Sequence, residues 1–260
     1  MSGPPSSRIP LVAGLPASLI GELHGEVAVV RLARPHKRNA LDRETVSGIE
    51  RLFPAMPETV KVLVLYGEGK HFCAGVDLDE IESRSAAEAL ALSRKWHRAF
   101  DGVEFGRVPV IAVLQGAVIG GGLELAAAAH IRVAERSTFY ALPEASRGIF
   151  VGGGGSVRLP RLIGTARVMD MILSGRTYGA EEGQSVGFSQ YVFDDGDGLA
   201  KGLEIARKIA SNTSLSNFAA MHVLPRIAEE NRESGFLTEA LTVAMVSSDN
   251  DAKLRVRKFL

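Results

Sequence analysis

Two stretches, "VIGGGLELA" at 118–126 and "PEASRGIFVGGGG" at 143–155, dominate the sequence. Each places one acid, Glu124 or Glu144, beside a run of glycines. Glycine weakens regular elements and carboxylates resist burial, so each choice has a physical cost. The sequence on either side of each stretch indicates which function could offset this cost.

The segment around Gly120–Gly122 has the pattern of a strand, a turn and a helix. Residues 109–116, "PVIAVLQG", form a short β-branched apolar run that is typical of a buried parallel strand. A helix beginning at the glycines would offer unpaired N–H groups and the positive end of its dipole to an oxyanion. Alternatively, the glycines only permit close packing of the helix, and Glu124 only interacts with the dipole.

A second segment repeats this design. Residues 61–80, "KVLVLYGEGKHFCAGVDLDE", read as a strand, a loop containing "CAGVD", and a helix-prone stretch. Two backbone N–H groups from separate loops could converge on one carbonyl oxygen. Such a pair would form an oxyanion hole.

Strands and helices alternate as far as residue 196, and this alternation predicts an α/β fold. We expect a flexible N-terminal tail at 1–16, a core at 17–196 and a helical region at 197–260. The predicted hairpin covers 18–34 and turns near His24–Gly25. The other predicted strands are 61–67, 109–116, 130–135, 137–142 and 189–194, and the predicted helices are 42–53, 86–100, 180–183, 198–211, 214–231, 235–248 and 251–259.

Charge and composition narrow the classes of function. The chain has 260 residues, with 30 basic and 30 acidic side chains, and this balance argues against nucleic acid or an anionic membrane as a partner. Its single cysteine, Cys73, fits a reducing compartment. The proline-broken N-terminus lacks a signal pattern, and the longest uncharged run, 108–123, is too short to span a bilayer. We therefore expect a cytoplasmic protein.

Three other motifs match known sites only partly. "GQSVG" at 183–187 has the spacing of a serine nucleophile elbow, but a helix-like segment precedes Ser185 and a strand-like one follows, the reverse of what the elbow needs. "HFCAGVDLDE" at 71–80 lacks a second Cys or His pair at zinc-like spacing. "GEGKH" at 67–71 lacks parts of a phosphate loop, and no G-x-G-x-x-G stands between a strand and a helix. We expect no metal and no nicotinamide cofactor.

Taken in order, several stretches resemble the crotonase (enoyl-CoA hydratase/isomerase) superfamily over nearly the whole chain. They are "RPHKRNAL" at 34–41, "CAGVDLDE" at 73–80, "GAVIGGGLELA" at 116–126, "PEASRGIFVGGGGSVRLPRLIG" at 143–164 and "AEEGQSVGFSQYV" at 180–192. The resemblance implies a crotonase-like spiral of ββα units. It also implies that the C-terminal helical region serves oligomerisation, in a homotrimer or homohexamer.

The resemblance further implies an acyl-CoA thioester as substrate, with no other cofactor. Its carbonyl oxygen would lie between the N–H groups of Val76 and Gly121. Hydratases of the family carry two glutamates, which match Glu124 and Glu144, so the pair favours syn addition of water to a trans-2-enoyl-CoA, giving 3-hydroxyacyl-CoA. Glu124 would deprotonate the water and Glu144 would protonate C2. Alternatives are enoyl-CoA isomerisation, a specialised acyl-CoA dehydration, or acyl-CoA binding without turnover.

Matching positions also predict residues that contact the substrate or its CoA. Leu92, Trp96 and Phe100 could wall the acyl pocket, and ordinary helix packing is an equal alternative for each. The sequence departs from the family pattern at Asp79, where a lysine is common, and at Val151, where a proline is usual. The predicted contacts are Arg38, Asn39, Ala40, Leu41, Ala74, Asp77, Leu78, Trp96, Gly120 and Lys258.

Overall fold

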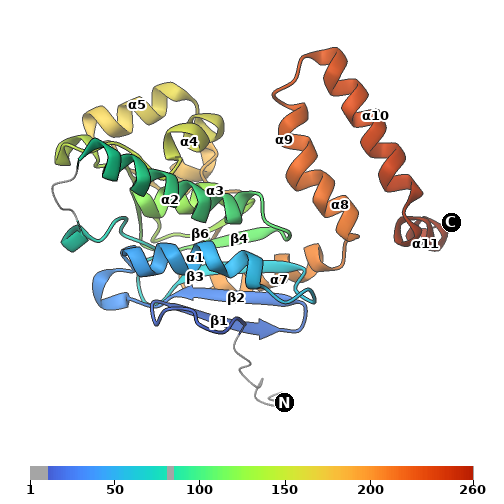
Figure 1. Cartoon of the computed structure of the whole chain (residues 1–260), viewed down its shortest axis with the longest axis horizontal. Coiled ribbons are helices and arrows are strands. Elements are labelled where there is room, and N and C mark those ends of the chain that lie inside the picture. Colours follow the sequence, from blue (N-terminus) through green and yellow to red (C-terminus); the bar gives the residue numbers. More distant parts are fainter. Residues whose placement is uncertain (1–10, 81–84, 260) are drawn as a thin grey trace.

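A computed structural model describes residues 11–80 and 85–259, without the side chains of the last two of these (Figure 1). The predicted α/β fold is confirmed. The N-terminal residues 1–10 of the expected tail, and the side chain of Lys258, lie outside the described part. The main sheet has six strands in the order β1-β2-β3-β4-β6-β9. They are β1 (Leu19–His24), β2 (Val27–Leu32), β3 (Val62–Gly67), β4 (Val110–Leu114), β6 (Ile131–Glu135) and β9 (Tyr191–Phe193).

The main sheet is parallel except at its first strand. β1 and β2 form the predicted antiparallel hairpin, which turns at Gly25 with a φ of 65°. Every other neighbouring pair runs parallel. Parallel strands are covered on both faces, which explains why the central strands β3 and β4 are continuous apolar runs rather than alternating with charged residues.

Two hydrophobic clusters cover the two faces. Val27 and Val29 of β2 pack with Ala206 of α7 (Gly198–Ala210) on one face. Ala28 and Val30 face the other cluster, to which α1 (Arg43–Ala55) and α2 (Ala86–Glu104) contribute. In Figure 1, α1 and α2 lie over the face of the sheet opposite α7. The sheet is therefore the middle of three layers.

A second sheet has three strands in the order β5-β7-β8, and the two glycine runs follow its strands β5 and β7 in the chain. It comprises β5 (Ala117–Ile119), β7 (Phe139–Ala141) and β8 (Tyr178–Gly179). The sequence did not predict β5 as a separate strand, because its three residues lie between Gly116 and Gly120, which both have a φ of 52°. α3 (Gly121–Ala128) follows β5 directly.

The sequence also did not predict two helices, α4 (Gly155–Ile163) and α5 (Thr165–Ser174). Pro160 stands inside α4, and proline usually signals the end of a helix. α6 (Ala180–Val186) matches a predicted helix. Short 3-10 turns cover Pro35–Lys37, Leu78–Glu80 and Ala145–Arg147.

The C-terminal helices form a hairpin beside the core (Figure 1). The predicted helix at 214–231 is divided into α8 (Ser214–Phe218), a π-helical segment (Ala219–Val223) and α9 (Leu224–Ile227). The break is consistent with Pro225, which cannot donate a backbone hydrogen bond. α10 (Arg232–Ser248) and α11 (Asn250–Phe259) complete the chain. α7, which follows residue 197, packs on the sheet itself. The predicted division of the chain at residue 197 stays a prediction.

His130 is a half-buried histidine directly before β6. Its Nδ1 accepts the Val110 N–H at 3.0 Å, and its Nε2 lies 3.1 Å from the carbonyl of Glu104. Burial lowers the pKa of His130 to about 4. Both ring nitrogens of His130 therefore have partners within the fold.

We expect the free energy of unfolding contributed by His130 to fall as the pH drops from about 6.5 toward 4. The unfolded chain binds the proton near the ordinary histidine pKa, whereas the folded chain binds it only near 4. The loss should reach about 3 kcal/mol. Urea unfolding of the wild type and of His130→Gln across this pH range isolates the effect. The same pH slope in both proteins would contradict it.

Candidate active site

Three backbone segments run side by side and bring the glycine-rich stretches together. Cys73 pairs in parallel with Val118 of β5, and β5 pairs in parallel with β7. Parallel neighbours end at the same edge of a sheet. The residues that follow each segment, Val76, Gly121 and Glu144, therefore emerge at one place.

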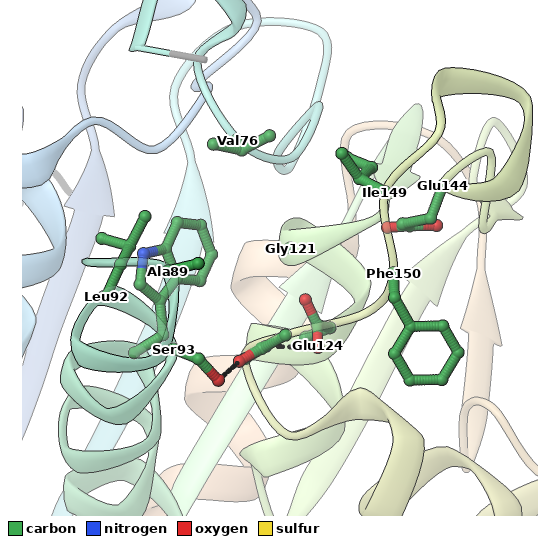
Figure 2. Close-up of a pocket in the computed structure, with 12 residues that line it drawn as sticks. Val76, Ala89, Leu92, Ser93, Gly121, Glu124, Glu144, Ile149 and Phe150 are labelled. Atoms are coloured by element: carbon green, nitrogen blue, oxygen red, sulfur yellow. Dashed lines mark hydrogen bonds between the residues drawn. The ribbon is translucent and has the colours of Figure 1, made fainter. Parts of the chain in front are cut away.

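A pocket of about 200 Å³ opens at this edge (Figure 2). Most of its lining is apolar, and two carboxyl groups face into it. An apolar pocket with a few convergent polar groups is the usual form of a small-molecule site. The lining residues are Val76, Ala89, Leu92, Ser93, Trp96, Gly121, Glu124, Glu144, Ile149, Phe150, Gly152 and Gly153.

The N–H groups of Val76 and Gly121 are both available at the pocket. Leu41 bonds to the residues on either side of Val76, donating to the Gly75 carbonyl at 2.8 Å and accepting from the Asp77 N–H at 2.9 Å. In a parallel pair this pattern turns the intervening N–H, that of Val76, to the opposite side. Gly121 begins α3, so its N–H has no partner within the helix. Neither N–H donates to another group of residues 11–80 or 85–259.

Glycine at position 121 also satisfies a packing constraint. A Cβ at Gly121 would lie 3.6 Å from the Val76 nitrogen and only 2.6 Å from the Trp96 ring. A Cβ at Gly122 would lie 2.4 Å from the carbonyl oxygen of Cys73. Close packing and open N–H groups therefore coexist here. The glycine run can serve both of the purposes considered from the sequence, close packing of the helix and access of an oxyanion to the backbone.

Glu124 is buried in the first turn of α3, with 4% of its surface exposed. Its Oε1 accepts the N–H groups of Gly153 at 2.7 Å and Gly155 at 2.8 Å. Burial raises the pKa of Glu124, while these two N–H groups and the charge of Arg158 act in the opposite direction. The carboxylate is thus oriented by donors that favour its ionised form.

Glu144 lies after β7 and points toward the same pocket (Figure 2). Burial, with a smaller contribution from the nearby charge of Glu124, raises the pKa of Glu144 to about 7. Its Oε2 is buried and has no hydrogen-bond partner in the described part of the chain. A Cβ at Gly120 would lie 2.6 Å from Oε1 of Glu144, and the φ of 52° at this position favours glycine. The two acids differ in their surroundings: donors hold Glu124, whereas Glu144 is free to carry a proton.

The structure brings together five of the predicted site residues in the pocket lining: Val76, Trp96, Gly121, Glu124 and Glu144. The remaining predicted contacts that can be placed lie outside the lining, and their roles stay predictions. Lys258 belongs to α11, but its side chain is outside the described part. The residues outside the lining are Arg38, Asn39, Ala40, Leu41, Ala74, Asp77, Leu78 and Gly120.

Several of these residues fix the loops around the site. The Asn39 side chain donates to the carbonyls of Glu68 at 2.9 Å and His71 at 2.7 Å. Asp77 accepts a hydrogen bond from Arg34 at 2.6 Å; burial alone would raise the pKa of Asp77, but this bond and the Arg34 charge lower it. Asp79 stands where a lysine is common in the family pattern, and it forms an ion pair with Lys37.

Part of the pocket wall was not predicted from the sequence. Residues that the sequence did not predict also line it: Ser93, Ile149, Phe150, Gly152 and Gly153. Of these, only the two glycines belong to a motif that the sequence analysis noted, and nothing in that motif indicated that it would turn toward Glu124. Leu92 and Trp96 line the pocket as expected. Phe100 is fully buried, packs edge-on against Trp96 at 5.5 Å between ring centroids, and does not reach the lining.

The other motifs do not form sites of their own. Ser185 lies within α6, ahead of β9, and its hydroxyl donates to the Glu182 carbonyl at 2.7 Å. Cys73 is buried, and burial raises the pKa of its thiol to about 12. Within the described residues, no three His, Cys, Asp or Glu side chains gather as metal ligands. No helix in that part is long and apolar enough to cross a membrane.

Comparison with known proteins gives consistent matches. A model of the enoyl-CoA hydratase/isomerase family matches residues 22–260. The enoyl-CoA hydratase ACTT3 of Alternaria alternata is 33% identical over 242 residues, covering 90% of this chain and 80% of that protein. The short-chain-enoyl-CoA hydratase of Clostridium acetobutylicum is 28% identical and covers 94% of both chains. A solved structure from Rhodopseudomonas palustris, provisionally named an enoyl-CoA hydratase, is 52% identical with a TM-score of 0.91, covering 93% of this chain and 94% of that one.

We expect Gly121→Ala to lower the free energy of unfolding by about 1–3 kcal/mol, because the added methyl must displace the Trp96 ring. Urea unfolding can be followed by the fluorescence of Trp96, the chain's single tryptophan. Gly235→Ala in α10 is the matched control, since its Cβ would meet the nearest atom at 3.6 Å. The control should be neutral or stabilising by up to about 1 kcal/mol. Equal stabilities of the two variants would contradict the packing described.

Proposed function

Because the chain belongs to the enoyl-CoA hydratase/isomerase family, we propose that it is an enoyl-CoA hydratase that adds water reversibly across the C2–C3 double bond of a trans-2-enoyl-CoA. The product is a 3-hydroxyacyl-CoA formed by syn addition. The observation that carries the proposal is the convergence of two backbone N–H groups and two glutamates on one apolar pocket.

Addition of water to the conjugated thioester places negative charge on its carbonyl oxygen. The N–H groups of Val76 and Gly121 would stabilise that charge, each by roughly 3 kcal/mol. Both groups are fixed before substrate arrives, Val76 by its pairing with Leu41 and Gly121 by the start of α3. Fixed donors stabilise developing charge without a cost of reorganisation during the reaction.

The environments of the two glutamates support different roles. Glu124, held as an acceptor by two N–H groups, would take a proton from the attacking water. Glu144, with its raised pKa and its unpartnered Oε2, would deliver a proton to C2. Two neighbouring buried carboxylates do not ionise together easily, so one of them holds a proton at neutral pH. The pair titrates as a unit.

The lining supports an acyl-CoA as substrate. Ala89, Leu92 and Trp96 from α2, with Ile149 and Phe150 from the loop after Glu144, would surround the acyl chain. The CoA portion would extend toward the predicted contacts at Arg38–Leu41 and Ala74. The reaction is redox-neutral and its charge falls on the thioester oxygen, so the proposal includes no cofactor beyond the CoA of the substrate.

The C-terminal region supports association with further copies of this chain. α10 exposes apolar side chains that a monomer would leave in water, and large exposed apolar patches usually mark interfaces. We propose a homotrimer or homohexamer, and a cytoplasmic location stays a prediction of the sequence. The exposed apolar residues of α10 are Phe236, Leu237, Leu241, Val243 and Met245.

We expect Glu124→Gln and Glu144→Gln each to lower the turnover of crotonyl-CoA at least about 100-fold, because each removes a group that transfers a proton. Loss of the absorbance of the conjugated thioester measures the rate, and isothermal titration with butyryl-CoA measures binding, which should persist. The control is Glu58→Gln, an exposed residue outside the pocket lining.

Wild-type turnover in Glu144→Gln would remove Glu144 as the proton donor. Loss of butyryl-CoA binding together with turnover would show that the glutamates hold substrate rather than transfer protons. A wild type that hydrates no enoyl-CoA would reject the proposed function.

A further inference from the structure

The segment Gly152–Gly155 depends on groups outside itself for its shape. Its N–H groups at Gly153 and Gly155 hold Oε1 of Glu124. Four consecutive glycines carry no side chains that could anchor them, and glycine has more backbone freedom than any other residue. The donors that orient Glu124 therefore need to be fixed from elsewhere.

Two side chains fix this segment through its carbonyl groups. The Ser93 hydroxyl donates to the Gly152 carbonyl at 2.7 Å, the bond drawn beside Ser93 in Figure 2. Nη1 of Arg158 donates to the Gly153 carbonyl at 3.1 Å. The Gly154 carbonyl is already used by the first turn of α4. Ser93 and Arg158 thus hold the two carbonyls that precede the helix.

Arg158 is itself held in place. Its side chain is only 9% exposed, and its Nε donates to Glu104 at 2.5 Å while Nη2 donates to Asp101 at 2.8 Å. Both acids lie on α2, the helix that also carries Ser93. Gly154 has a φ of 100°, and a Cβ there would lie 2.2 Å from Nη1 of Arg158, so the guanidinium packs directly against the glycine backbone.

The charges that face Glu124 come from three elements. Glu144 approaches from the segment after β7, and the charge of Glu124 contributes to the raised pKa of Glu144. Arg158 approaches from α4, and its positive charge lowers the pKa of Glu124 against the effect of burial. Asp101 and Glu104 of α2 lie on the other nitrogens of Arg158. Arg158 is the cation in this set.

We propose that Arg158, anchored by Asp101 and Glu104, is a positioning residue for the reaction: by holding the Gly153 carbonyl it fixes the two N–H groups that orient the Glu124 carboxylate. Ser93 supports the same segment through Gly152. This inference rests on the proposed function, because it concerns the base of that reaction. Arg158 itself lies outside the pocket lining and acts through the glycine segment.

The test compares Arg158→Met with Arg158→Lys, which keeps the charge but not the fork of donors. We expect Arg158→Met to lower kcat for crotonyl-CoA about tenfold to 100-fold with KM changed less than about threefold, since the base is misplaced while the substrate pocket remains. The acidic limb of the kcat/KM profile should move to higher pH. Arg158→Lys should recover part of the rate and part of the shift.

Arg161→Met is the matched control on the same helix, because Arg161 is exposed, forms an ion pair with Glu229 at the surface and donates to the Val157 carbonyl of its own helix. It should retain wild-type rate and pH profile. A folded Arg158→Met with lowered kcat but an unmoved acidic limb would overturn the proposal, as would equal effects in Arg161→Met. If Arg158→Met does not fold, Ser93→Ala and Arg158→Lys decide: a smaller shift of the limb in the same direction supports positioning, and no shift in either overturns it.

A measurement without turnover separates this proposal from the proposed function. Infrared difference spectra between each protein and its Glu124→Gln counterpart isolate the carboxyl band of Glu124. In Arg158→Met the protonated band should persist to higher pH than in the parent protein. If the wild type hydrates no enoyl-CoA, the proposed function fails and this band alone decides the positioning role; an unchanged titration overturns it.

Discussion

The site depends on the parallel alignment of three backbone segments that end at one edge. Cys73 against Val118 and β5 against β7 place the ends of these segments side by side, although the segments are spread over residues 73–141 of the sequence. The alignment sets the two N–H donors and Glu144 around one pocket without any side chain reaching far. The glycines after the first two segments, Gly75 and Gly120–Gly122, let the backbone approach the pocket closely, and the two proposed oxyanion donors are main-chain groups.

Burying two carboxyl groups in an apolar wall is unfavourable, and the surroundings offset this cost unequally. Glu124 gains two N–H groups from the segment Gly152–Gly155, which Ser93 and Arg158 hold against α2. Glu144 has no such support at its Oε2. This inequality is the basis of the roles that we propose, because a carboxyl supported by N–H donors is the better base and an unsupported one is the better acid.

Much of this site could be predicted from sequence. Short local patterns indicated the strands of the main sheet and a helix start at Gly120–Gly122, and the resemblance to the crotonase superfamily indicated the paired roles of Glu124 and Glu144. Arg158 and Ser93 gave no such signal, since their role comes from contacts with Gly152 and Gly153 that no local pattern encodes. α4 was missed because Pro160 lies inside it, and β5 because a three-residue strand is too short to show a period.

On the proposed function, the N–H groups of Val76 and Gly121 together polarise one thioester carbonyl. Infrared difference spectroscopy of butyryl-CoA carrying carbon-13 at the thioester carbonyl measures this directly, because the saturated chain binds without being hydrated. We expect the labelled carbonyl stretch to move to lower frequency on binding to the wild type and to move less in Gly121→Ala. A carbonyl stretch that stays at its value in free solution would show that the two N–H groups do not polarise the thioester.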